Sequence, residues 1–283
     1  MKKLLLPILL TLLTSLAARA QPLYYIDFTG SVAKIVFTDN SKRGIPGYAQ
    51  LECTYDFGYV RDTLAGNVRP ANTTMKLLIG KNVSRFCSPM MMLVDSVAHN
   101  NIREAEMDQR MAMSMPFTDM SQVYKKHSEK KLLFTDLLID THFIYEEPLE
   151  VQEWTILDEY REILGYECQR AECDFRGRKY IAWFTAEIPI SEGPWKFFGL
   201  PGLILSVADD KGHYRYEMTG IETVDDKPIL FARRDYMKTD RRTYLAALRR
   251  YREDPFLFSG SERSEPGRIR PDIQYDLMER DYR

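Results

Sequence analysis

The chain has 283 residues, with 39 basic and 41 acidic side chains and a net charge of −2 at pH 7. This near balance argues against a nucleic-acid-binding protein, which would carry a clear excess of basic charge. The apolar fraction of 45% is enough for a folded core, and the length allows one large domain or two small ones.

The first twenty residues have the three parts of a secretory signal peptide. Lys2 and Lys3 precede an apolar run from Leu4 to Leu16, and Ala18-Arg19-Ala20 forms a small-x-small cleavage motif. This order is typical of export, and the run is too short to span a bilayer comfortably, although an uncleaved anchor helix is the alternative. Cleavage after Ala20 would leave 263 residues with a net charge of −5. We expect the mature protein, without a transmembrane span, in the periplasm or at the outer cell surface.

Four cysteines would reach an oxidising compartment: Cys53, Cys87, Cys168 and Cys173. They allow three disulfide pairings. Cys168 and Cys173 lie in one expected strand with an odd offset, which puts them on opposite faces and roughly 16 Å apart along the strand. A disulfide needs Cα atoms within about 7 Å, so we expect these two not to pair with each other. Four buried thiols are the alternative to any bridge.

The first 130 residues predict strands followed by a helical segment. Tyr24 to Phe37, Gln50 to Tyr59, Met75 to Ile79 and Val83 to Cys87 have strand-like composition. Residues 98 to 130 are polar, Met-rich and poor in β-branched side chains. The sequence therefore predicts a helical insertion with flanking loops there.

The strand pattern resumes at Lys131. Further strands are predicted at Leu132–Tyr145, Trp154–Leu157, Tyr160–Asp174, Lys179–Ile188, Leu203–Val207 and Tyr214–Ile221. A turn at residues 174–177 predicts a hairpin, and the arm that follows is apolar on both faces. Thr239 to Tyr251 predicts a helix, because Tyr244, Leu245, Leu248 and Tyr251 recur at helical spacing.

Regularly spaced strands joined by tight turns indicate a mainly β (α+β) fold. We expect a large curved antiparallel sheet with one or two helices, resembling at fold level the half-barrel of lipoprotein carriers. Residues 21–258 form one domain in this prediction. The charged tail, residues 259–283, is expected to be extended or partly disordered.

Residues 165 to 208 carry the most specific motif. They spell GLPGLI at Gly199 to Ile204, preceded by Gly165-Tyr166-x-Cys168, Ala182-Trp183 and Gly193-Pro194. This segment resembles the GLPGLI family of secreted bacterial proteins, whose function is unknown. The resemblance implies export and supplies no catalytic residues.

The same segment predicts a tight corner outside the sheet. Its glycines permit backbone angles closed to other residues, and its prolines fix φ. Trp195, Phe197 and Phe198 between them are too apolar to stay in water, so we expect an architectural corner whose rings enter the core. The alternative is an apolar ligand pocket. Its candidate residues are Trp183, Trp195, Phe197, Phe198 and Leu200.

Two groups of residues are weak metal candidates, and the sequence predicts no metal site from them. Met111, Met113 and Met115 carry thioethers that suit Cu(I), although adaptable packing or a Met-rich binding surface explains them better. Asp140 and His142 would point the same way from a strand, but no second His lies close in sequence.

Basic residues cluster on the second predicted helix. Arg241, Arg242, Arg249 and Arg250 are candidates for contact with an anionic head group or an acidic partner. A solvated helix face is the ordinary interpretation of such a cluster.

No H-E-x-x-H, G-x-S-x-G, C-x-x-C or phosphate-binding Gly-rich loop is present. The sequence therefore predicts no catalytic residue and no cofactor. The favoured function is a non-enzymatic envelope protein that binds or carries a lipid, another apolar molecule or an envelope partner. A structural module of a surface complex and a hydrolase with a dispersed site are the alternatives. An apolar cavity without titratable groups would favour the carrier, and a cleft with a perturbed Asp, Glu or His the enzyme.

Overall fold

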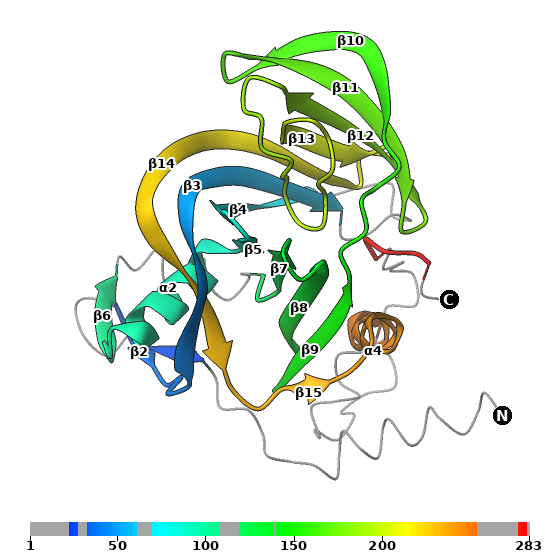
Figure 1. Ribbon diagram of the computed structural model, residues 1–283. Coiled ribbons are helices and arrows are strands. Elements are labelled where there is room, and N and C mark those ends of the chain that lie inside the picture. Colours follow the sequence, from blue (N-terminus) through cyan, green and yellow to red (C-terminus); the bar gives the residue numbers. More distant parts are fainter. Residues whose placement is uncertain are drawn as a thin grey trace, which may run out of the picture.

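The computed structural model describes residues 23–27, 33–60, 70–107, 119–138, 140–253 and 277–281. One twelve-stranded sheet dominates these residues (Figure 1). Its strands, in spatial order, are β10 (Thr155–Ile163), β11 (Tyr166–Phe175), β12 (Arg178–Thr185), β13 (Leu203–Asp209), β14 (Tyr214–Arg233), β3 (Lys42–Val60), β4 (Pro70–Gly80), β5 (Val83–Cys87), β7 (Gln122–Lys126), β8 (Lys131–Leu138), β9 (Thr141–Pro148) and β15 (Met237–Lys238).

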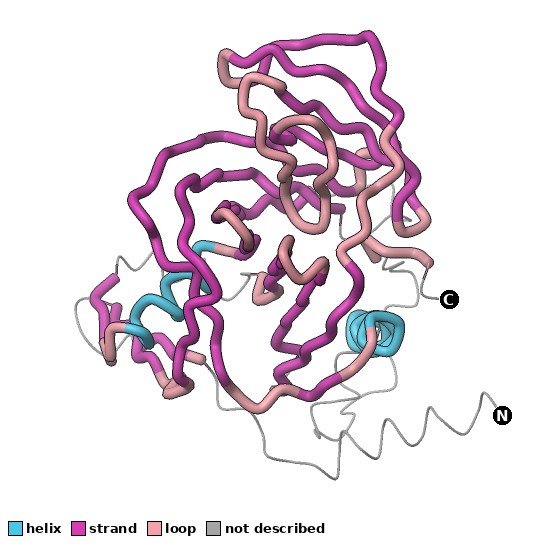
Figure 2. The backbone as a smooth tube through the Cα atoms, viewed as in Figure 1, coloured by secondary structure: helices cyan, strands magenta, loops and turns pink. Residues whose placement is uncertain are grey.

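All neighbours in this sheet pair antiparallel except β9 and β15, which are parallel. Strands β10 and β15 stand at opposite edges, so the sheet is not closed. Figure 2 shows how much of the described chain is strand and how little is helix. The predicted mainly β fold with a large curved antiparallel sheet is confirmed.

The long strands β3 and β14 form the centre of the sheet and bend together through a wide arc (Figure 1). They pair from Tyr214 opposite Tyr59 to Arg233 opposite Lys42, and the register shifts at three places along the pair. Such irregularities bend a strand locally and increase its twist. Because side chains alternate between the two faces, Tyr214, Tyr216 and Met218 at the start of β14 share one face of this arc, and all three are buried.

A separate three-stranded sheet consists of β1 (Tyr24–Asp27), β2 (Ala33–Phe37) and β6 (Glu104–Met107). Several predicted strands are divided in the structure. The predicted strand at residues 24–37 contains β1 and β2, and residues 132–145 contain β8 and β9. The predicted strand at 160–174 is interrupted by a turn at Leu164-Gly165, where both residues have positive φ, so β10 and β11 form a hairpin.

Helix α2 (Pro89–His99) begins at a cap in which the Ser88 side chain accepts a hydrogen bond from the Met91 amide. It buries Met90, Met91, Val94 and Val97 in a cluster with residues of β2. The helix predicted within residues 98–130 is therefore wrong for the described residues. After the end of α2 they form β6 and β7, while residues 108–118 lie outside the described chain.

The polar strand β7 explains part of this error. Its residues Gln122 and Lys125 are buried, and both have polar partners. Arg85 donates to the Gln122 amide oxygen, and Glu192 pairs with the Lys125 ammonium. Buried polar side chains need such partners, which lie far away in the chain. Composition alone therefore pointed away from a strand.

Helix α4 (Arg241–Glu253) confirms the helix predicted at Thr239 to Tyr251. Asp240 caps its first turn by accepting a hydrogen bond from the Thr243 amide at 3.0 Å. Neither helix of the described chain is long and apolar enough to cross a membrane. Of the predicted tail only residues 277–281 are described, and Leu277 is buried there.

All four cysteines are buried and unpaired in the structure. Cys168 and Cys173 both lie in β11, as predicted, and the strand pairs with β12 without a register shift. Burial raises the pKa of the Cys168 thiol to about 11, which keeps it protonated and poorly reactive.

Candidate functional site

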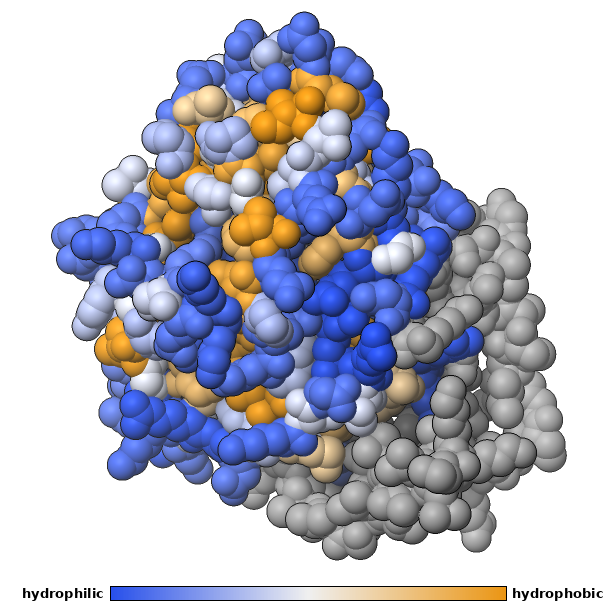
Figure 3. Space-filling model, turned by 45° about the vertical axis from the view of Figure 1, so that its right-hand side comes forward, coloured by the Kyte–Doolittle hydropathy of each residue, from blue (hydrophilic) through white to orange (hydrophobic). Residues whose placement is uncertain are grey.

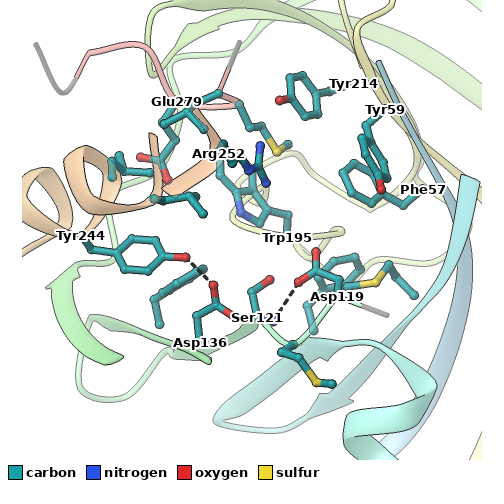
Figure 4. A pocket seen from close by; sticks show the side chains of 18 of the residues that line it. Phe57, Tyr59, Asp119, Ser121, Asp136, Trp195, Tyr214, Tyr244, Arg252 and Glu279 are labelled. Carbon is teal, nitrogen blue, oxygen red and sulfur yellow. Dashed lines mark hydrogen bonds between the residues drawn. The ribbon is translucent and has the colours of Figure 1, made fainter. Parts of the chain in front are cut away.

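A cavity of about 340 Å³ lies between the sheet, helix α4 and the C-terminal residues 277–279 (Figure 4). Strands β3, β4, β5, β8, β9 and β14 supply its sheet side. Ten of the residues that line it are aromatic. The rings belong to Phe57, Tyr59, Phe86, Phe134, Tyr145, Trp195, Tyr214, Tyr216, Tyr244 and Tyr251.

Strand register places the aromatic rings of the sheet side against one another. Phe57 and Tyr59 alternate on β3, and their direct partners on β14 are Tyr216 and Tyr214. Side chains directly opposite each other in an antiparallel pair are close neighbours. The Phe57 and Tyr216 rings accordingly stack with centroids 4.5 Å apart. This stacking makes a continuous aromatic wall.

Helix α4 closes the cavity with one face. Tyr244, Leu245, Leu248 and Tyr251 all line it, together with Arg252. Their spacing of three, four and seven residues keeps them on one side of the helix. The periodicity that predicts the helix thus also marks its cavity face.

Two carboxylates form a polar end of the cavity. Asp136 of β8 accepts a hydrogen bond from the Tyr244 hydroxyl and one from the Leu137 amide at 2.8 Å. Asp119 accepts one from the Ser121 amide at 2.8 Å. Within the described chain neither carboxylate forms an ion pair, and neither does Arg252, which also lines the cavity.

The environment changes the acidity of Asp136. Burial raises the pKa of its carboxyl to about 6, and the nearby Asp119 carboxylate adds to the rise. The hydrogen bond from Tyr244 and the charge of Arg252 oppose it. Burial also raises the pKa of Tyr244 well above its ordinary value, so this phenol stays protonated as a donor. Asp136 therefore titrates close to neutral pH.

The third acidic residue of the lining, Glu279, is neutralised by cations. Its Oε1 lies 2.8 Å from the Lys196 ammonium and its Oε2 2.6 Å from the Arg241 guanidinium. Lys196 also pairs with Glu147, and all three side chains of this group are almost fully buried. These pairs fix the C-terminal segment against the rest of the protein.

The predicted corner lies between β12 and β13, outside the sheet. Trp195, Phe197 and Phe198 are 7%, 0% and 7% exposed, as expected of rings that enter the core. Trp195 has φ +50, a left-handed conformation that is costly for a bulky residue. The surrounding contacts must therefore hold it firmly.

Of the five predicted pocket residues, the structure brings only Trp195 to the cavity. Phe197 packs on Tyr180 with ring centroids 4.7 Å apart, and Phe198 and Leu200 are likewise buried in the core. Trp183 is partly exposed on β12, with the Arg161 guanidinium 4.4 Å from its ring centroid.

A buried lysine supports the corner from β7. The Lys125 ammonium donates to the carbonyl oxygens of Gly193 at 2.7 Å and Phe197 at 3.0 Å. Burial lowers the pKa of Lys125, and Glu192 beside it favours its charged form. Burial alone would raise the pKa of Glu192, but Lys125 and His127 hold it below its usual range. This cluster satisfies corner carbonyls and does not line the cavity.

The metal candidates do not assemble. Met111, Met113 and Met115 lie outside the described residues. The Arg234 guanidinium lies 3.1 Å from Nε2 of His142. Burial, together with this guanidinium, lowers the pKa of His142 to about 4. The Asp140 carboxylate accepts a hydrogen bond from the hydroxyl of neighbouring Thr141 at 3.3 Å. Across the described ranges no group of three or more His, Cys, Asp or Glu is placed to hold a metal ion.

The four candidate arginines have different surroundings. Arg241 pairs with Glu279 and Asp281, so it is occupied within the protein. Arg242 is exposed, and Arg249 and Arg250 are half-buried. The face of the molecule in Figure 3 is mostly hydrophilic with dispersed apolar patches.

Sequence reasoning missed the polar end of the cavity. Asp119 and Asp136 are brought together by the β7–β8 hairpin, in which Gln122 pairs with Thr135. The register of this hairpin sets Ser121 next to Asp136 and is the signal that could have revealed the pair. Arg252 comes directly after Tyr251, the last residue of the predicted helix face, so the sequence could also have indicated it as a cavity residue.

The comparisons with known proteins agree with the motif. A family model described as a protein of unknown function (Porph_ging) matches residues 176–206, which include the GLPGLI string. The resemblance to this family is confirmed over that segment. A search of curated proteins found no match.

Two solved structures of PNGF-II, in space groups P21 and C2, are similar to this chain at 14% identity. Their TM-scores are 0.48 and 0.45, and they cover 70% and 69% of this chain. This chain spans 32% of the length of each PNGF-II chain.

Proposed function

We propose that the protein binds a small, largely apolar molecule in the cavity between its curved sheet and helix α4. The observation that carries this proposal is a cavity of about 340 Å³ whose lining includes ten aromatic residues. Small-molecule sites usually measure about 300–1,000 Å³ and combine apolar walls with a few polar groups. Aromatic side chains supply much contact area at low cost in conformational entropy.

Export, which the N-terminal segment predicts, would make this a binding protein of the cell envelope. A carrier and a sensor of the same molecule would need the same cavity. The polar end of the cavity departs from the purely apolar carrier expected from the sequence. It narrows the choice of ligand, which must satisfy carboxylates as well as rings.

A hydrolase is the second candidate, favoured by one observation. Asp136 has a pKa near 6 in a cavity, which suits a general acid or base. Binding is the better-supported function, because attack by a side-chain hydroxyl needs a base beside that hydroxyl. In the described chain no hydrogen bond joins the Ser121 hydroxyl to a carboxylate or a histidine.

The test uses the fluorescence of Trp195, which lines the cavity. Phenethyl alcohol, a neutral aromatic probe, should quench it saturably, and a Trp195→Phe variant should lose this signal. Leu248→Phe fills the cavity from α4 and should weaken binding about tenfold, or about 1.4 kcal/mol. Ala246→Phe is the matched control on the exposed side of the same helix and should bind normally.

Saturable quenching that Leu248→Phe leaves unchanged would place the probe elsewhere and contradict the proposal. Absence of any quenching up to the solubility of the probe would do the same. Thermal melts of both helix variants establish that they remain folded.

A further inference from the structure

We infer that the cavity selects an organic cation, an amine whose apolar body packs on the aromatic walls and whose ammonium group meets Asp119 and Asp136. This inference rests on the proposed function and names the ligand class of the same site. Three observations support it: the charge left over in the lining, the free acceptor positions of the two carboxylates, and the rings around them.

The charge balance of the lining is negative. Glu279 is compensated by Lys196 and Arg241 at 2.8 and 2.6 Å. Asp119 and Asp136 remain without an ion-pair partner in the described chain, against the single cation Arg252. Buried charges are costly unless a partner compensates them. A ligand ammonium would supply the charge that the described residues do not.

The two carboxylates still have room to accept hydrogen bonds. Asp136 receives one bond from Tyr244 and one from the Leu137 amide, and Asp119 receives one from the Ser121 amide. An ionised carboxylate has about four acceptor positions, so several stay open on each group. Figure 4 shows the two carboxylates on either side of Ser121, at the same end of the cavity. One ammonium carries three donors, which suits two nearby carboxylates.

The rings of the wall also favour a cation. An ammonium close to an aromatic face is attracted by the negative centre of the ring. The protein already uses this effect beside the cavity, where the Lys196 ammonium lies 5.4 Å from the Trp195 ring centroid and 5.8 Å from that of Phe134. Both rings line the cavity as well. An anionic ligand would meet the two carboxylates and gain only Arg252.

The experiment compares phenethylamine with phenethyl alcohol, which have nearly the same shape and differ in charge. With the parent protein near neutral pH, the amine should quench Trp195 at a concentration about tenfold lower than the alcohol needs. Asp136→Asn should lower the affinity for the amine to about that for the alcohol, and it should change the affinity for the alcohol far less. Asp119→Asn is the second variant, in case Asp136→Asn fails to fold.

Arg252→Gln is the matched variant of opposite sign. It removes the only cation of the lining without an ion-pair partner in the described chain, so amine binding should become tighter by more than alcohol binding changes in either direction. A variant that merely disturbed the cavity would weaken both probes. This divergence separates an electrostatic effect from a structural one.

The pH dependence adds an independent readout. Among the described residues, Asp119, Tyr244 and Arg252 act on the Asp136 carboxyl. His142, Arg234 and Tyr236 line a second, small pocket together with it. An alkylamine with a pKa of about 10 stays protonated through the neutral range. Its affinity should therefore rise as the pH increases through about 6, where Asp136 ionises, while the affinity of the alcohol stays flat.

The outcomes distinguish this inference from the proposed function. Equal binding of both probes by the parent protein would overturn amine selection and leave the binding site standing. If neither probe binds, the proposed function itself fails and takes the inference with it. An amine preference that survives both Asp136→Asn and Asp119→Asn would also overturn the assignment to this end of the cavity.

Discussion

The Lys196 ammonium lies 2.8 Å from Oε1 of Glu279, although the two residues are far apart in the chain. Lys196 belongs to the corner before the GLPGLI string, and Glu279 to the C-terminal segment. Glu147 of β9 completes the group at 2.5 Å from the same ammonium. Because Trp195 and Glu279 both line the cavity, this ion cluster holds two of its walls together.

Replacing Lys196 should destabilise the protein severely. Lys196→Met removes the most buried of the cations that Glu147 and Glu279 share, and leaves them only the more exposed Arg176 and Arg241 within the described chain. Loss of one partner of a buried pair costs about 3–5 kcal/mol of unfolding free energy, which chemical denaturation can measure. Lys179→Met is the control, because Lys179 is 50% exposed in its pair with Glu172 and its replacement should cost far less. Similar losses for the two variants would contradict the role of the cluster.

The glycines of the GLPGLI corner should tolerate no side chain. A Cβ at Gly202 would lie 2.0 Å from the carbonyl oxygen of Thr185, a backbone atom of β12 that cannot easily move. Gly202→Ala should therefore cost about 3 kcal/mol through overpacking. Gly212→Ala is the control, since Gly212 has φ +66 but nothing within 4 Å of the added Cβ. It should cost only the backbone penalty of about 1–2 kcal/mol.

Thermal or chemical unfolding compares these two variants with the parent. Gly199→Ala should show both kinds of strain. Gly199 has φ +96, and its added Cβ would lie 2.3 Å from the flexible Val151 side chain. If Gly202→Ala is no less stable than Gly212→Ala, the close approach to β12 is not a packing constraint.

Acid should destabilise the protein through His142. Burial and the neighbouring Arg234 lower the pKa of His142 to about 4 in the folded protein, whereas the unfolded chain binds this proton near pH 6.5. The unfolded state therefore binds more protons between these values. The stabilising contribution is complete above about pH 6.5 and is lost as the pH falls towards 4.

Melting temperatures measured from neutral pH to about pH 4.5 test this effect. His142→Gln keeps an acceptor for Arg234 but cannot be protonated, so its melting temperature should fall less on acidification. His99→Gln changes an exposed histidine at the end of α2 and should follow the parent. A parallel decline in all three proteins would exclude His142 as the source.

We propose that the chain is exported and cleaved after Ala20. N-terminal sequencing of the exported protein should then begin at Gln21, which can cyclise to pyroglutamate. Ala20→Phe replaces the small residue that a signal peptidase requires and should leave the precursor uncleaved. Detection of Met1 to Ala20 on the mature parent protein would contradict this prediction.

Local sequence patterns predicted most strands because their causes are local. Alternating aromatic and polar residues in Tyr214 to Ile221, the turn at residues 174–177 and the spacing of Tyr244, Leu245 and Leu248 each reflect one element. The order of strands in the sheet could not be predicted from the sequence. The pairing of β14 with β3 depends on contacts between distant segments, and no single segment encodes its partner.

The site was predicted only in part for the same reason. Trp195 was a candidate because rings among glycines and prolines are conspicuous in a sequence. Asp119 and Asp136 have ordinary neighbours, and they acquire their chemistry when the β7–β8 hairpin and α4 enclose them. The raised pKa of Asp136, and the lack of a counter-charge for both carboxylates within the described chain, are properties of the enclosure and not of the residues.

The pairing of β3 with β14 has a kinetic consequence. Strand β4 follows β3 closely in the chain and can form a hairpin with it early, but the other edge of β3 has to wait for residues 214–233. Closing so long a loop is entropically costly, and folds rich in distant strand pairs fold slowly. Until β14 arrives, a long row of unpaired amide and carbonyl groups on β3 stays open to other chains. Refolding at high protein concentration should therefore lose material to aggregation through this strand before it loses material through any other.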